Sequence, residues 1–161
     1  MTQAEREALF VRYDKGPELL RAAWSRIPAE ARQWRPGANK WTAHEIIVHC
    51  ADSETISAMR IRYLVGEAGP VIAGYDQDRW ASTFNYHQLP VDLSFAQIAS
   101  VRAWTSVLIR QLPASAWERS GRHTEYAEPY TAETWLTVYA EHLEIHTRQL
   151  ERNLGAWQSR A

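Results

Sequence analysis

Four stretches of the sequence repeat apolar residues at spacings of three, four and seven, the period of a helix that buries one face. They cover approximately residues 9–28, 42–65, 94–111 and 131–154. We predict one helix for each stretch and no strand of convincing length between them. The chain is therefore expected to be all-α.

Turn-forming and capping residues mark the ends of these stretches. Thr42 is followed three positions later by Glu45, the pattern of a capping box at a helix start. The pair Gly16-Pro17 interrupts the first stretch, for which we predict a kink or two short helices. Gly155 is predicted to stop the last helix.

The connection over residues 66–93 is long for a small domain and is punctuated by Gly and Pro. A connection of this length can carry the chain back along a bundle, so that the third helix runs parallel to the second. We predict a four-helix bundle, up-down-down-up, with a long crossover between the second and third helices. A chain of 161 residues favours a single domain, residues 1–161.

Charge and hydropathy exclude several classes of protein. The 18 Lys and Arg nearly balance the 19 Asp and Glu, and no dense basic run suggests a nucleic-acid surface or membrane attachment. No apolar run approaches membrane-spanning length, and the N-terminus lacks the apolar core of a signal peptide. The single Cys50 excludes an internal disulfide, which suits a reducing compartment. We therefore expect a cytoplasmic protein.

The last helical stretch contains YAEHLEIHTRQLER, in which His142 and His146 are four positions apart and share a helix face. Four apolar or aromatic residues fall within about 60° of His142 on a helical wheel: Trp135, Val138, Tyr139 and Ile145. Leu143 and Glu144 lie well away from this stripe. Two buried imidazoles disfavour each other's protonation, and a divalent metal would satisfy both lone pairs. Two hydrogen-bonded core histidines are the alternative, and the HxxxH pair alone favours it.

The second stretch supplies a third candidate ligand. Its inward residues are expected to be Ile46, Cys50, Ser53, Ser57 and Leu64. His49 borders this stripe, and three inward histidines on two helices favour a metal site. Cys50 is interpreted as a small core residue and not as a nucleophile. His44, His87 and His123 are predicted to lie at the surface.

At this point the sequence resembles a known family. The segments KWTAHEIIVHCADSE, AGYDQDRWA and YAEHLEIHTRQLER together resemble the DinB/YfiT-like superfamily of metalloenzymes. The resemblance implies a bundle with a long crossover and a divalent metal, zinc or nickel, held by His49, His142 and His146. It also implies a homodimer. Several members of that family use low-molecular-weight thiols, and others are described as metal-dependent hydrolases.

Three neutral imidazoles leave a divalent metal with open coordination positions, the pattern of a catalytic site. The open position can hold water for hydrolysis or a thiol cosubstrate for S-transfer to a small molecule. A non-catalytic metal- or ligand-binding bundle is the alternative. No catalytic residue is assigned, because Leu143 replaces the Glu that an HExxH motif would supply.

Five further residues are candidates for supporting the ligands or lining a pocket. Asp52 and Glu54 follow His49 on the same helix and could support the ligands, but each residue taken alone favours the interpretation as an ordinary surface carboxylate. Asp76 and Trp80 lie in the crossover, where turn capping and helix packing explain them equally well. Tyr139 shares the inward face of the HxxxH helix.

Overall fold

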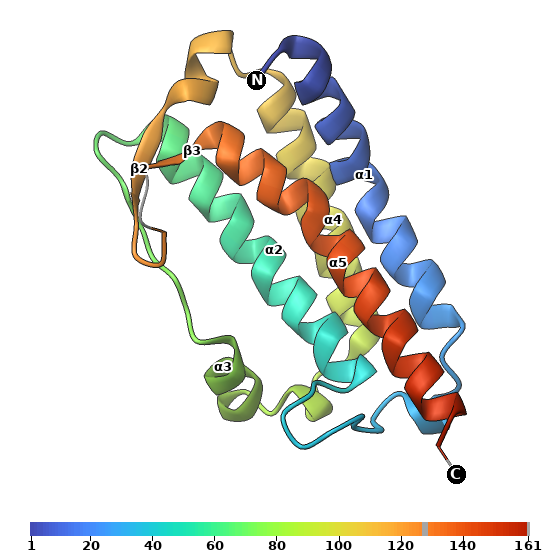
Figure 1. The fold of residues 1–161 in the computed structure, drawn as a ribbon. Helices are drawn as coiled ribbons and strands as arrows, with labels where there is room; N and C mark the ends of the chain where they lie inside the picture. Colours follow the sequence, from blue (N-terminus) through green and yellow to red (C-terminus); the bar gives the residue numbers. More distant parts are fainter. Residues whose placement is uncertain (127–128, 161) are drawn as a thin grey trace.

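Four long helices make up most of the computed structural model, which describes residues 1–126 and 129–160 (Figure 1). They are α1 (Gln3–Ser25), α2 (Ala43–Gly66), α4 (Val91–Arg110) and α5 (Ala132–Gln158). α1 and α5 run in one direction, and α2 and α4 run in the other. This is the predicted up-down-down-up bundle, and the all-α fold class is confirmed. None of the helices in the described part is long and apolar enough to cross a membrane.

Side-chain caps fix the starts of the two helices that carry the candidate ligands. Thr42 Oγ1 accepts the Glu45 N–H (3.1 Å), and Glu45 Oε2 accepts the Thr42 N–H (2.8 Å), completing the predicted capping box of α2. Thr131 Oγ1 accepts the Thr134 N–H (3.0 Å) at the start of α5. Capping therefore sets where each histidine falls along its helix.

α1 continues through Gly16 and Pro17, so the prediction of two short helices was wrong. A β-carbon at Gly16 would lie 2.6 Å from Arg102 Nη1 and 3.1 Å from Leu143 Cβ. Glycine at this position lets α1 pack closely against α4 and α5. Tertiary packing therefore compensates for the hydrogen bond that Pro17 cannot donate.

Two predicted helix boundaries shift for a similar reason. Gly155 does not end α5, which continues to Gln158 because Leu154 and Trp157 pack against the apolar core. α4 begins at Val91, three residues before the predicted start, and Val91 packs against the same core. Packing extends both helices past weak sequence signals.

The connections contain short elements that the sequence did not reveal. The crossover carries strand β1 (Val71–Ile72) and helix α3 (Gln77–Thr83), and the last connection carries β2 (Ser120–His123) and β3 (Tyr130–Thr131). β1 pairs parallel with β2, which pairs antiparallel with β3. Short 3-10 turns cover Ala29–Ala31, Tyr86–Gln88 and Ala114–Glu118. The small sheet joins both connections beside one end of the bundle (Figure 1).

The core has two apolar clusters with a polar layer between them. One cluster includes Leu20, Trp24, Ile46, Phe95 and Leu150. The other includes Tyr13, Ile61, Ile109, Trp117 and Trp135. Between them along α2 lie Ser53, Glu54 and Ser57, all buried. Ser53 and Glu54 of this polar layer contact His142, one of the three candidate metal ligands.

Candidate metal site

His49 from α2 and His142 and His146 from α5 lie together. One ring nitrogen from each can be chosen so that all three nitrogens lie within 4.8 Å of one another. The His49 ring centroid is 4.9 Å from that of His146 and 5.7 Å from that of His142, and the two α5 rings are 4.6 Å apart. His49 is 2% exposed, whereas the other two are partly buried. The structure thus brings together the three histidines that the sequence singled out.

Two of these rings are held through their other nitrogen. His142 Nδ1 lies 3.2 Å from Glu54 Oε1, and His146 Nδ1 lies 2.8 Å from Gln149 Oε1. Both partner oxygens are acceptors, so each Nδ1 carries the proton and each Nε2 is the ring nitrogen with a lone pair. A hydrogen bond of this kind is the usual way to orient a metal-binding imidazole.

The donor set fits a divalent ion. His49 Nδ1 is buried and has no hydrogen-bond partner within residues 1–126 and 129–160. Ser53 Oγ lies 3.2 Å from His142 Nε2. Three converging imidazoles, one with an unsatisfied buried nitrogen, match the ligand chemistry of zinc and similar metals.

Burial keeps the imidazoles of His49 and His146 neutral. It lowers the pKa of His49 well below its ordinary value, and the charges of His146 and His142 lower it further. Burial, followed by the charge of His142, lowers the pKa of His146 to about 3. A metal binds only the neutral imidazole. His49 and His146 therefore do not have to lose a proton before they bind a metal near pH 7.

Glu54 is fully buried, so the favoured interpretation of this residue as a surface carboxylate was wrong. Arg102 Nε donates to its Oε2 and Arg102 Nη2 to its Oε1, each at 2.8 Å. Burial alone would raise the pKa of Glu54, but the charge of Arg102 and the hydrogen bonds from His142 and Arg102 hold it at about 2. An ionised Glu54 therefore orients His142 and stabilises its Nδ1 proton.

Arg102 was missed by the sequence analysis. It lies four positions after Ile98 and seven after Phe95, in the inward register of its helix. A buried arginine needs an acidic partner, and Glu54 on the neighbouring helix was an available one. That combination was the signal that could have identified the ion pair.

Aromatic rings border the histidines. The Trp41 ring lies 4.6 Å from the His49 ring, and Trp41 Nε1 donates to Asp78 Oδ1 (2.7 Å) at the start of α3. The buried Tyr139 ring lies 5.7 Å from the His142 ring. A hollow of about 300 Å³ reaches His146 between α3 and the segment before α2. A small molecule can approach the cluster from this side.

The other predicted supporting residues have separate roles. Asp52 accepts the Tyr86 hydroxyl (2.5 Å), and Asp76 accepts the Arg79 N–H (2.9 Å) as the N-cap of α3. The Trp80 ring packs against Tyr75, with centroids 4.4 Å apart. For Asp76 and Trp80, capping and packing account for the contacts seen.

The remaining histidines are outside the cluster. His44 Nε2 lies 2.9 Å from Leu89 O, and His87 Nε2 lies 3.1 Å from Thr42 Oγ1, both on partly exposed rings. His123 was predicted at the surface, but it is 3% exposed. The prediction was wrong because β2 pairs with β1 and places this ring inside.

The buried arc of α5 also differs from the predicted one. Leu143 is fully buried and Ile145 is 45% exposed, the reverse of the expectation. α5 packs against α1 as well as α2, so its buried arc is shifted towards Leu143. The two histidines therefore lie at one edge of the buried arc, where a ligand can reach them.

Comparison with known proteins identifies relatives. The family model of the DinB superfamily matches residues 12–150. An Oceanobacillus iheyensis protein provisionally named a metal-dependent hydrolase is 32% identical over 107 residues, which is 66% of this chain and 60% of that protein. A Geobacillus kaustophilus protein with the same provisional name is 25% identical over 134 residues, covering 83% and 75%. This chain thus spans about 60% of the length of the Oceanobacillus relative.

Two solved structures share the fold. YfiT from Bacillus subtilis, described as a probable metal-dependent hydrolase with an unusual four-helix bundle topology, superposes with a TM-score of 0.87 at 22% identity. That match covers 96% of this chain and 90% of YfiT. A DinB-like protein, YjoA, from the same species gives a TM-score of 0.59 at 14% identity, covering 96% and 94%.

Proposed function

Because this chain belongs to the DinB superfamily, we propose that it is a metal-dependent enzyme in which three histidines hold a divalent ion, zinc or nickel. The ligands would be His49, His142 and His146. The observation that carries the proposal is the convergence of their nitrogens within 4.8 Å, with Glu54 and Gln149 orienting two of the rings. The provisional names of the relatives support the same class of function.

Three ligands favour an enzyme over a non-catalytic metal-binding bundle. Within the part of the chain that the structure describes, no fourth His, Cys, Asp or Glu joins the cluster. Structural zinc sites usually have four protein ligands, whereas catalytic sites keep a position open. When bound, the ion would lower the pKa of a water or thiol and so supply a nucleophile near pH 7.

Two reactions suit such a site, and the surrounding carboxylates favour one of them. Hydrolysis would use a general base within reach of the nucleophilic water. Glu54 is ion-paired with Arg102 and has a pKa of about 2, and Asp52 accepts a hydrogen bond from Tyr86. Neither carboxylate is placed to accept a proton readily. Activation of a low-molecular-weight thiol needs no such base, so thiol S-transfer is our first candidate, with hydrolysis, favoured by the relatives' names, as the second.

Metal analysis tests the ligand assignment. Protein purified without a histidine tag is loaded with zinc or nickel, dialysed and analysed for bound metal. We expect about one ion per chain in the wild type and in His44→Ala, which removes a histidine outside the cluster. The double variant His142→Ala/His146→Ala should lose the ion. Equal metal content in the double variant and the wild type would reject the site.

An activity screen then separates the two reactions. The loaded protein is offered electrophiles with a panel of cellular thiols, and separately esters and amides without thiol. Consumption of an electrophile that depends on thiol, on metal and on His142 supports S-transfer. Thiol-independent cleavage of an ester or amide supports hydrolysis. No metal-dependent turnover in either arm favours the non-catalytic alternative.

A further inference from the structure

Arg60 on α2 carries a positive charge, and both of its hydrogen-bond acceptors are neutral. Its Nη1 donates to the Tyr139 hydroxyl (2.9 Å) and its Nη2 to Ala73 O (2.7 Å), both neutral acceptors. Its Nε is buried without a hydrogen-bond partner, and no carboxylate of residues 1–126 or 129–160 forms an ion pair with it. An unpartnered buried donor on a cation costs free energy, which an anion would recover.

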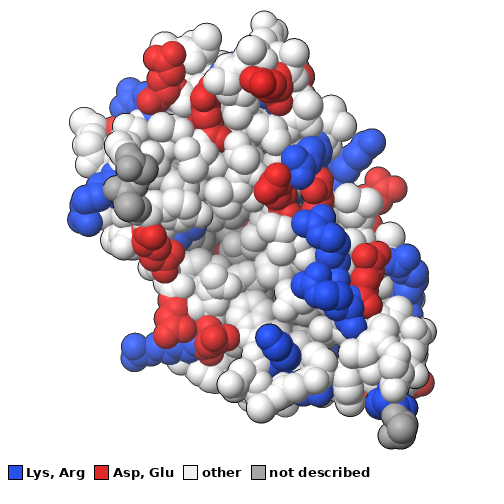
Figure 2. All heavy atoms as spheres, viewed as in Figure 1, with Lys and Arg blue, Asp and Glu red and all other residues white. Residues whose placement is uncertain are grey.

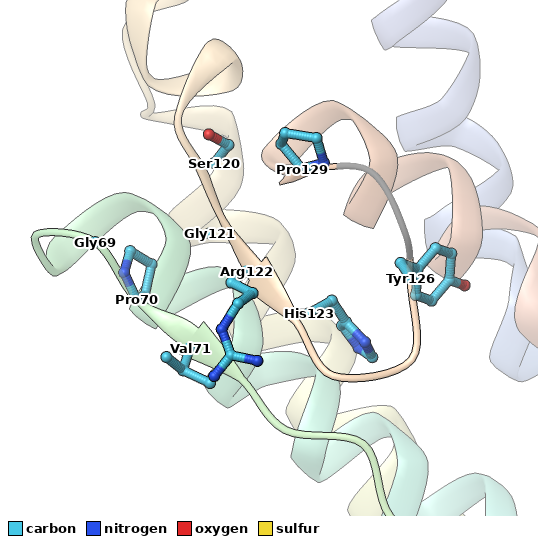
Figure 3. A pocket seen from close by; sticks show the side chains of 9 residues that line it. All are labelled: Gly69, Pro70, Val71, Ser120, Gly121, Arg122, His123, Tyr126 and Pro129. Carbon is cyan, nitrogen blue, oxygen red and sulfur yellow. The ribbon is translucent and has the colours of Figure 1, made fainter.

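His123 supplies a second unpartnered donor. Its Nδ1 accepts the Glu125 N–H (3.1 Å), so the neutral ring carries its proton on Nε2. That Nε2 is buried and has no partner among the described residues. The ring lies between Tyr126 and Tyr130, at centroid distances of 4.8 and 4.9 Å. Figure 3 shows it extending away from Arg122, and it borders a hollow of about 490 Å³ along β2.

The strand register brings these two groups to the same region. Arg60 binds the carbonyl of Ala73, the residue after Ile72, and Ile72 is the register partner of His123. Burial first, and then the charge of Arg60, lowers the pKa of His123, whereas the charge of Glu125 raises it. The low pKa keeps His123 neutral, so at neutral pH its Nε2 is a donor that adds no second positive charge.

Tyr139 connects this region to the three histidines. Arg60 donates to the Tyr139 hydroxyl (2.9 Å), and the Tyr139 ring lies 5.7 Å from the His142 ring. Figure 2 shows a hollow in the middle of the molecular face that carries α2, with Lys or Arg atoms at the edge of the hollow. Tyr139 therefore places the two regions next to each other.

We propose that Arg60 and His123 form a binding site for a carboxylate. Each carries one buried N–H without a hydrogen-bond partner among the described residues, and a carboxylate has two oxygens that accept such bonds. A charged guanidinium–carboxylate bond is stronger than a neutral one. This inference rests on the proposed function. The carboxylate would belong to the substrate or thiol cosubstrate, whose reacting group lies at the three histidines. Arg60 and His123 would then select anionic over neutral molecules of the same shape.

A pair of probes that differ only in charge tests this site. Propionate and propionamide are titrated separately into ¹⁵N-labelled protein, with and without zinc, while NMR follows the backbone amide resonances of β1 and β2, which every variant retains. We expect propionate to bind at least roughly tenfold more tightly than propionamide. Arg60→Gln should abolish the preference, and His123→Phe, which keeps an aromatic ring between the two tyrosines, should reduce it several-fold.

The matched control is Arg62→Gln, because Arg62 donates only to Ala58 O on its own helix. This variant should keep the full preference. Equal binding of acid and amide, or a preference that persists in both Arg60→Gln and His123→Phe, overturns the inference. A preference seen without zinc supports the carboxylate site even if metal analysis rejects the metal site. Zinc binding without any preference rejects the carboxylate site alone.

Discussion

Glu54 shows at the scale of one residue how the fold and the candidate site depend on the same group. It is 0% exposed, accepts two hydrogen bonds from Arg102 and accepts one from His142. A buried ion pair adds little net stability by itself, but removing one partner leaves an uncompensated charge. Arg102 is 2% exposed, so water cannot replace the lost carboxylate.

We therefore expect Glu54→Gln to lower the free energy of unfolding by about 3–5 kcal/mol, since Arg102 keeps its charge and loses its counter-ion. Urea denaturation followed by circular dichroism measures this change. The control is Glu151→Gln, which removes the exposed pair with Arg26 and should cost less than about 1 kcal/mol. Similar losses in both variants would show that Glu54 does not neutralise a buried charge.

Glu45 gives a prediction about pH. Burial raises its pKa, but the hydrogen bond from the Thr42 N–H and the charge and hydrogen bond of Arg35 outweigh burial, so the pKa falls below 4.5. The unfolded chain therefore takes up this proton at a higher pH than the folded one, and the stabilisation by Glu45 is present above pH 4.5 and lost as pH falls through the folded pKa. Glu45→Gln should be less stable than the wild type at pH 7, with a difference that shrinks in acid. Urea titrations at several pH values measure it, and a pH-independent difference would contradict the assignment.

At the scale of elements, the close contact of α1 with α4 and α5 depends on Gly16. Alanine normally stabilises a helix interior by about 1 kcal/mol relative to glycine. At Gly16, however, the new β-carbon would lie 2.6 Å from Arg102 Nη1. This nitrogen donates to Tyr13 O, and Nε and Nη2 of the same guanidinium donate to Glu54, so the group cannot move away freely. We expect Gly16→Ala to be destabilising by about 1–3 kcal/mol, the usual cost of overpacking.

Gly155 offers the matched substitution, because it also lies within a helix but a β-carbon added there would meet no atom within 4 Å. Gly155→Ala should therefore raise the midpoint of thermal unfolding, and Gly16→Ala should lower it. Differential scanning calorimetry of both variants compares the two effects. If Gly16→Ala were stabilising, α1 could move away from α4 and α5 without a loss of packing energy.

The elements also show why some predictions succeeded. The long helices and their order followed from apolar periodicity, because a helix of twenty residues repeats its pattern several times. The strands of two to four residues were missed, since so short a segment has no measurable alternation. Leu143 was wrongly predicted to lie away from the core. The helical wheel assumed that only the face of α5 around His142 is buried, whereas α5 also packs against α1 on the side of Leu143.

The candidate site was predictable where its residues share a helix face and obscure where they do not. His142 and His146 are four positions apart, so local geometry alone places them together. Arg60 and His123 are brought to the same region only by the pairing of β1 with β2, which joins residues 51 positions apart in the register Ile72–His123. Such a contact depends on tertiary structure and leaves no local pattern.

For the molecule as a whole, the two apolar clusters lie on either side of the polar layer. Each cluster includes residues from α1, α2, α4 and α5, so each holds the bundle together without the histidines. Most helical stability in proteins comes from such packing. A metal at the three histidines would therefore add to the stability of a bundle that already folds.

The final prediction follows from this arrangement. Protein treated with a chelator should keep its helical circular dichroism, and added zinc should raise the midpoint of thermal unfolding by roughly 5–10 °C at about 100 times its dissociation constant. The rise should persist in His44→Ala and disappear in His142→Ala/His146→Ala, while both variants stay helical without metal. If the chelator instead unfolds the wild type, the ion is needed for folding. That result would favour a structural site with a filled coordination sphere over the open catalytic site proposed for this bundle.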